Sequence, residues 1–316
     1  MITNYMPTLR KPFPDSTDWY KSFYNIFYLS QVTNLTLLSY MDSFIQIYSR
    51  QYILESKHEE LLKRKIISKN KNSETNDMYD FIIHDEEALK SLDLEDFIPQ
   101  IIEEKIYNNF RQTNDISLCM GLQIDKSLNK DISINLIDLL KTTNSKNWYS
   151  LIKGFMNIWE FLFLYSRVEN TLKEILKIEG KTTTEKLLQN LYNKYPILEQ
   201  RLIDNGYLES KGNSNIWILY TEFRHLYSHT HGMITKNGKG RLCSKIHNLK
   251  NSLKEMDILS SAFINIDNIF KSNTLKIGKF YLLQDEELNI FRNFIIILME
   301  NLDIIDKDNK TPKENK

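Results

Sequence analysis

Three histidines and an arginine crowd into one short segment late in the chain, and these residue types can do chemistry. The segment Glu222–Gly232 reads E-F-R-H-L-Y-S-H-T-H-G and contains Arg224, His225, His229 and His231. Histidine titrates near neutral pH and can accept or donate a proton, while a guanidinium stabilises the negative charge that develops on phosphorus. The segment is therefore suited to attack on a phosphodiester.

Cleavage of RNA does not require a nucleophile from the protein, because the 2′-hydroxyl of the RNA can attack the phosphorus. Such a reaction requires no metal ion, serine or cysteine, and we predict no cofactor. The two cysteines, Cys119 and Cys243, are far apart and lack CxxC spacing. They predict neither a disulfide framework nor a zinc ribbon, and a reducing, cytoplasmic compartment fits them best.

A metal site is the alternative use of the same histidines. His225 and His229 have the i, i+4 spacing of a zinc-binding helix, and His231 follows closely. The glutamate of the HExxH pattern is missing, however. The sequence therefore favours acid–base chemistry over a metal centre.

The motif is expected to lie on a helix that is capped by Asn213 or Ser214 and ends at Gly232, with Gly238 and Gly240 beyond it. Apolar residues recur on one side of this helix at Ile216, Tyr220, Phe223, Tyr227 and Ile234.

Helical geometry separates the arginine from the last histidine of the helix. Residues five apart differ in direction by about 140°, so Arg224 and His229 do not share a face, whereas His225 and His229 do. The matching helix of a second protomer would bring one copy's Arg224 to the other copy's His229. We therefore predict a homodimer with a composite active site.

An acidic residue on a preceding helix stands out. Apolar residues at helical spacing predict a helix from Leu151 to Leu176, and Glu169 falls on its apolar stripe. A carboxylate at that position needs a partner, since burying it unpaired costs several kcal/mol. Arg224 is one candidate partner, and Lys173, at i+4 on the same helix, is the other.

A local run of basic residues follows the motif. Lys236, Lys239, Arg241 and Lys245 have no acidic residue among them, and none follows until Glu255. These four side chains are candidates for binding the RNA backbone, and the alternative is a solvated loop and helix face.

Arg224 and His229, with four residues between them, a polar residue directly after the arginine and a glycine shortly after the histidine, resemble the signature of the HEPN superfamily. Its members are small all-α domains, commonly dimeric, and many are metal-independent endoribonucleases of toxin–antitoxin, phage-defence and stress systems. The resemblance covers about Asn147–Asp303. It includes the segment Tyr165–Lys173, similar to the acid-bearing helix of several HEPN groups, and a final helix entered through Gly278.

The resemblance assigns roles to individual residues. It implies that Arg224 and His229 are the catalytic pair, that His225 occupies the polar position more often held by asparagine, and that Glu169 is the supporting acid. It also implies single-stranded RNA cleavage through 2′-hydroxyl attack, a toxin or anti-phage role, and control by an antitoxin or sensor partner. The alternative function is a non-catalytic HEPN-like helical dimer that binds a partner protein or a nucleotide.

Composition predicts a helical protein. Only 9 glycines and 6 prolines occur in 316 residues, and the 41% hydrophobic content is sufficient for a buried core. We predict an all-α fold with three regions: an N-terminal helical region of unknown role at 1–143, a HEPN-like helical bundle at 144–305, and a disordered tail at 306–316. A short extended connector is expected at 275–283, before a helix at 285–302.

Charge and hydropathy exclude two further classes. The 41 basic and 41 acidic residues balance, so non-specific coating of nucleic acid by bulk charge is excluded. No apolar run approaches the ~18 residues that span a bilayer, and the N-terminus lacks the pattern of a signal peptide. We therefore predict no membrane association.

Overall fold

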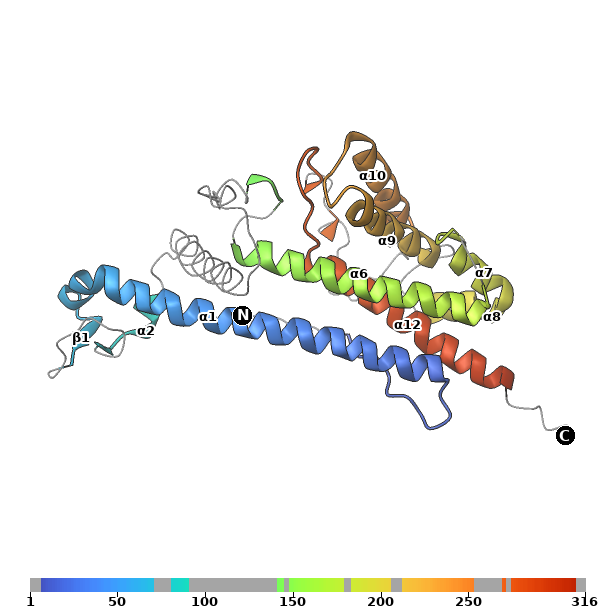
Figure 1. The fold of residues 1–316 in the computed structure, drawn as a ribbon, viewed down its shortest axis with the longest axis horizontal. Coiled ribbons are helices and arrows are strands. Elements are labelled where there is room, and N and C mark those ends of the chain that lie inside the picture. The colour runs from blue at the N-terminus through green and yellow to red at the C-terminus, as the bar shows by residue number, and fades with distance from the viewer. Residues whose placement is uncertain are drawn as a thin grey trace, which may run out of the picture. The chain divides into compact units, whose positions relative to one another are not determined.

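The structure is a computed structural model, and nearly all of its elements are helices (Figure 1). This confirms the all-α prediction, and the one sheet among the described residues is a two-stranded hairpin. Each helix in that part of the chain is too short or too polar to span a bilayer. The described ranges are 7–70, 81–90, 141–144, 148–178, 183–205, 212–252, 269–270 and 274–310.

The chain forms two compact units. Their limits differ from the boundary predicted between residues 143 and 144. The first unit comprises residues 1–34, 142–145 and 150–316, and the second comprises 35–141 and 146–149. Helix α1 (Asp18–Lys63) therefore contributes its beginning to the first unit and the remainder to the second. The last helix, α12 (Asp285–Lys310), extends past residue 306, where the tail was predicted to begin.

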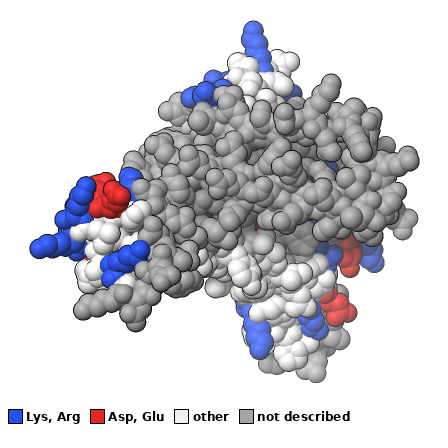
Figure 2. All heavy atoms as spheres, turned by 60° about the vertical axis from the view of Figure 1, so that its left-hand side comes forward, with Lys and Arg blue, Asp and Glu red and all other residues white. Residues whose placement is uncertain are grey.

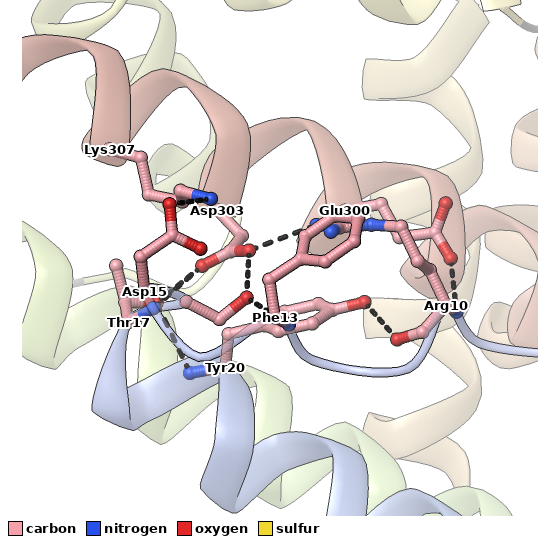
Figure 3. Close-up of polar contacts among 9 residues, drawn as sticks. Arg10, Phe13, Asp15, Thr17, Tyr20, Glu300, Asp303 and Lys307 are labelled. Atoms are coloured by element: carbon pink, nitrogen blue, oxygen red, sulfur yellow. Dashed lines mark hydrogen bonds and ion pairs between the residues drawn. The ribbon is translucent and has the colours of Figure 1, made fainter.

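The start of α1 belongs to the first unit because a carboxylate from α12 binds it (Figure 3). Thr17 caps α1, since its hydroxyl accepts a hydrogen bond from the amide of Tyr20 at 3.4 Å. Asp303, fully buried on α12, accepts hydrogen bonds from the amide and the hydroxyl of Thr17 and from the hydroxyl of Ser16, each at 2.9 Å. The end of the chain therefore completes the cap of its first helix.

The same carboxylate also fixes the segment that precedes α1. Arg10 Nη2 donates to Asp303 at 2.9 Å, and the amide of Arg10 donates to Glu300 at 2.6 Å (Figure 3). The hydroxyl of Tyr20 donates to the carbonyl of Arg10 at 2.7 Å. An ion pair between Lys307 and Asp15, 2.6 Å long, closes the cluster.

A buried ion pair joins three helices of the first unit. Arg292 on α12 donates from Nε and Nη2 to the two oxygens of Glu160 on α6 (Trp148–Leu176), at 2.8 and 2.5 Å. The side-chain amide of Asn34 on α1 also donates to Glu160. Both charged side chains are less than a tenth exposed.

Aromatic side chains build the core between α6, α9 (Gly212–His229) and α12. Tyr165 stacks on Trp217 with ring centroids 5.0 Å apart, and Phe291 lies 4.9 Å from Tyr220. Two shorter helices, α7 (Lys186–Lys194) and α8 (Pro196–Asn205), precede α9. This packing fixes the helix that carries the histidine motif.

Helix α10 (Lys236–Lys250) begins where the sequence predicts a break at Gly238 and Gly240. The Thr235 hydroxyl accepts from the Gly238 amide at 3.0 Å and caps the helix. Leu242, Ile246 and Leu249 are buried along it. Cap and burial together offset the helix penalty of the two glycines.

The connector predicted at 275–283 is non-helical, but Lys276–Lys279 forms a turn and the bridges to other segments are at Phe280. Ile234 donates to the carbonyl of Lys279, and Tyr281 donates to the carbonyl of Gly232, both at 2.9 Å. Gly232 has φ +80°, and a Cβ there would lie 2.3 Å from the ring of Phe280. Glycine is therefore required immediately after the histidine motif.

The second unit contains the only strands among the described residues. Strands β1 (Ile67–Lys69) and β2 (Phe81–Ile83) pair antiparallel, and α2 (Glu86–Lys90) follows. Its core is Leu54, Leu61, Ile66, Ile67, Phe81 and Leu89. From its polar composition the stretch 70–76 is expected to be a loop, and apolar spacing predicts helices at 86–110 and 249–270. Most of these residues lie outside the described ranges.

Candidate functional site

His225 and His229 lie side by side at the end of α9. Their ring centroids are 5.6 Å apart, His225 is half-buried, and His229 is exposed. Neither imidazole forms a hydrogen bond or ion pair with a described residue. The pair is therefore held by the helix alone and is open to a ligand.

Arg224 occupies a different side of α9, in agreement with its helical direction. It is half-buried near Tyr165 of α6, where its charge partly offsets the rise that burial causes in the pKa of Tyr165. Its guanidinium has no hydrogen bond or ion pair with any residue in the described ranges. His231 lies beyond the helix on a left-handed backbone, with φ 48°.

Glu169 is bound by its own helix. Lys173 Nζ donates to its carboxylate at 2.6 Å, and the Thr184 hydroxyl lies at 3.4 Å. The lysine alternative is therefore confirmed, and Glu169 forms no ion pair with Arg224. Lys173 is one turn away on the same helix, so this pair requires no second helix to be ordered.

An ion pair that the sequence did not predict borders the histidines. Arg241 Nε on α10 donates to Glu222 Oε1 on α9 at 2.6 Å. The Glu222 side chain is 9% exposed, whereas that of Arg241 is 59% exposed. The spacing contained a signal for Glu222, since His225 and His229 follow it by three and seven residues on one helical face.

Helices α9 and α10 run antiparallel in a fixed register. Besides the Glu222–Arg241 contact, Asn215 Nδ2 donates to the carbonyl of Asn248 at 3.3 Å. The two contacts are seven residues apart on each helix, in opposite chain directions. His225 is therefore level with Gly238, in the first turn of α10.

The four basic residues predicted to bind RNA all lie on α10 but do not share a face. At 100° per residue, Lys236 and Lys245 point about 180° apart, and Lys239 and Arg241 about 160° apart. In the view of Figure 2, the described Lys and Arg side chains form separate groups, some with acidic neighbours. A single RNA strand thus cannot contact all four side chains along one face of α10.

Burial lowers the pKa of His225, and nearby charges modify it. Desolvation is the main cause, Glu222 acts in the opposite direction, and the positive charges of Arg224 and His229 add to the lowering. Glu185, which precedes α7, raises the pKa slightly. The neutral imidazole is favoured, which is the form that can accept a proton.

In the described ranges, no three His, Cys, Asp or Glu side chains converge as a metal site would require. Comparisons of the chain with protein-family models, with curated proteins and with solved structures find no match.

Proposed function

We propose that the end of α9 is the active site of a metal-independent endoribonuclease of HEPN type that acts on single-stranded RNA. The observation that supports this best is the pair of neighbouring imidazoles, whose ring centroids are 5.6 Å apart, with His225 half-buried and His229 exposed. Phosphoryl transfer places the attacking and leaving oxygens in line on opposite sides of phosphorus. Two adjacent histidines can serve these two oxygens, one as base and the other as acid.

The lowered pKa of His225 suggests which histidine takes which role. His225, whose pKa is lowered by burial, removes the proton from the 2′-hydroxyl, and the 2′-oxygen attacks phosphorus. The bond from phosphorus to the 5′-oxygen breaks, and His229 protonates that leaving oxygen. The products end in a 2′,3′-cyclic phosphate and a 5′-hydroxyl.

A guanidinium is needed for the charge that develops on phosphorus. In the homodimer we propose, Arg224 of a second copy supplies it, because Arg224 and His229 of one copy lie on different sides of α9. Glu169, which binds Lys173 on α6, is the supporting acid in this proposal. A toxin or anti-phage role, under the control of an antitoxin or sensor partner, is part of the same proposal.

Cleavage of total RNA in the presence of EDTA tests the nuclease. We expect His229→Ala and His225→Ala each to lower the cleavage rate by about 10²-fold or more, the usual contribution of general acid–base catalysis. His247→Ala is the matched control, since His247 is an exposed histidine on α10 that bonds Asn251. Equal cleavage by all four proteins would reject the proposal.

The second candidate function is binding of a partner protein, and an aromatic row on α6 favours it. Phe155, Trp159 and Phe163 follow one another at four-residue intervals, and Trp159 is 78% exposed. Exposed aromatic residues on a face without charges are typical of protein interfaces. A second copy of the chain is the partner we propose here. In light scattering, the Trp159→Ser variant should show a smaller fraction of dimer than the unaltered chain. If that fraction is unchanged and RNA stays intact in the cleavage assay, binding through another surface is favoured.

A further inference from the structure

We propose that Arg241 is a phosphate-binding residue of the histidine site, that it acts within one protomer, and that Glu222 holds it in place. Its part in RNA cleavage rests on the function proposed above, whereas phosphate binding can be measured without cleavage. The inference adds a guanidinium from the same chain to the one that Arg224 of a second copy supplies in the proposed homodimer.

The first argument is the way in which the guanidinium is bound. Arginine presents five N–H donors in a planar fork. Glu222 accepts only the Nε–H group, at 2.6 Å, and Arg241 has no other partner in the part of the chain that the structure describes. The four donors on Nη1 and Nη2 therefore remain available, on a side chain that is more than half exposed. They suit two oxygens of one phosphate.

The second argument is direction. Glu222, His225 and His229 fall within about 60° of one another around α9. Because Arg241 contacts Glu222, its guanidinium lies on this same side of the helix. Arg224 points about 100° away from His225 and about 140° away from His229, toward Tyr165. Of the two arginines, Arg241 is thus the one on the histidine face.

The third argument concerns space and charge. A Cβ at Gly240, next to Arg241, would meet no neighbouring atom within 4 Å, so the surface here is open. Glu222 is almost buried, and its charge is directed at Arg241 rather than at solvent. Glu185, which precedes α7, is the other acidic residue that acts on His225. A phosphate beside Arg241 therefore meets the exposed guanidinium of Arg241 next to a carboxylate that this arginine already binds.

Inorganic phosphate is the probe, titrated into the full chain while the imidazole C–H resonances of His225 and His229 are followed by NMR. We expect phosphate to shift both resonances. The double variant Glu222→Gln/Arg241→Gln should raise the Kd for phosphate roughly tenfold or more, because hydrogen bonds to a charged group are lost. This variant leaves no unpaired buried charge, so its fold is preserved, and circular dichroism verifies that.

Arg201→Gln is the matched control. Arg201 on α8 also forms a single ion pair, with Asp308 at 3.7 Å, but lies outside the site. Its Kd for phosphate should equal that of the unaltered chain. An unchanged Kd in the double variant would overturn the proposal. Failure of the nuclease would appear separately, as intact RNA in the EDTA assay with phosphate binding retained.

Discussion

Two glutamate–arginine pairs of the first unit differ in their burial and in the number of hydrogen bonds that join them. Glu160 and Arg292 are both nearly buried and bind through two parallel hydrogen bonds, with Asn34 adding a third. Glu222 and Arg241 bind through one hydrogen bond, and the arginine is more than half exposed. The first pair uses both carboxylate oxygens, and the second leaves most of its guanidinium donors unused.

The difference indicates that the burial of an ion pair decides whether its charged groups only stabilise the fold or can also bind a ligand. A buried pair must satisfy its donors and acceptors within the protein, because unpaired groups there are costly. A pair at the edge of the core can fix an arginine with one bond and expose the remaining donors to a ligand. The predictions below test this contrast, from the largest expected effect to the smallest.

Arg292→Ala should be the most destabilising substitution, because it leaves the Glu160 carboxylate buried without its cation. We expect the free energy of unfolding to fall by about 3–5 kcal/mol. Arg241→Ala should cost about 1 kcal/mol or less, as is usual for an exposed pair. Urea denaturation of both variants measures the difference, and equal losses would contradict the contrast.

Glu287 is a buried carboxylate that forms no ion pair with any described residue, and it should make stability depend on pH. Desolvation raises its pKa to about 8, although Tyr281 and the amide of Gln284 donate to its oxygens at 2.5 and 2.9 Å. The folded state keeps the proton that the unfolded state loses above pH ~4.5. The contribution of Glu287 to the free energy of unfolding is thus fully present below pH ~4.5. It falls by about 1.4 kcal/mol per pH unit as the pH rises to ~8.

Glu287→Gln should remove this slope, because glutamine resembles the protonated acid. Thermal unfolding at several pH values between 4.5 and 8 should show the variant gaining stability relative to the unaltered chain as the pH rises. Gln284→Ala, which keeps the carboxyl group and the backbone amide, is the control and should retain the slope. Parallel curves for the unaltered chain and Glu287→Gln would refute the role of Glu287.

Asp303→Asn should cost about 2 kcal/mol in the free energy of unfolding. The substitution keeps the shape of the side chain but removes the charge that Arg10 binds, and it replaces one acceptor with a donor facing Ser16 or Thr17. Chemical denaturation measures the loss. Asp308→Asn, in an exposed pair with Arg201, is the control and should change stability by less than about 0.5 kcal/mol.

The smallest expected effect concerns the pKa of His225. Because the Glu222 carboxylate raises this pKa, Glu222→Gln should lower it further. An NMR titration of the imidazole measures the change, and His247, at the far end of α10, serves as the internal reference. A rise in the pKa of His225 would show that Glu222 does not act on it as the structure indicates.

Local signals in the sequence predicted the helices that carry or support the site. The helix through Glu169, the start of the last helix near Asp285 and the non-helical connector before it are all present. Each depends on residues close together in the chain, where spacing and capping chemistry are decisive.

Pairings between distant residues were not predictable in this way. Glu222 and Arg241 are 19 residues apart on different helices, and Asp303 binds residues more than 280 positions earlier. No local pattern specifies such partners, because they depend on how the helices pack. The predicted boundary between residues 143 and 144 placed residues 1–34 in a different region from the helices they bind, because those contacts also depend on how the helices pack.

The cap that Asp303 provides for α1 has a consequence for folding during synthesis on the ribosome. The amide of Thr17 and the carboxylate that binds it are 286 residues apart. At about 5–20 residues per second, a ribosome needs roughly 15–60 seconds to travel between them. During that interval the nascent first helix lacks its partner, so the unit that bears the histidines can close only when synthesis is nearly finished.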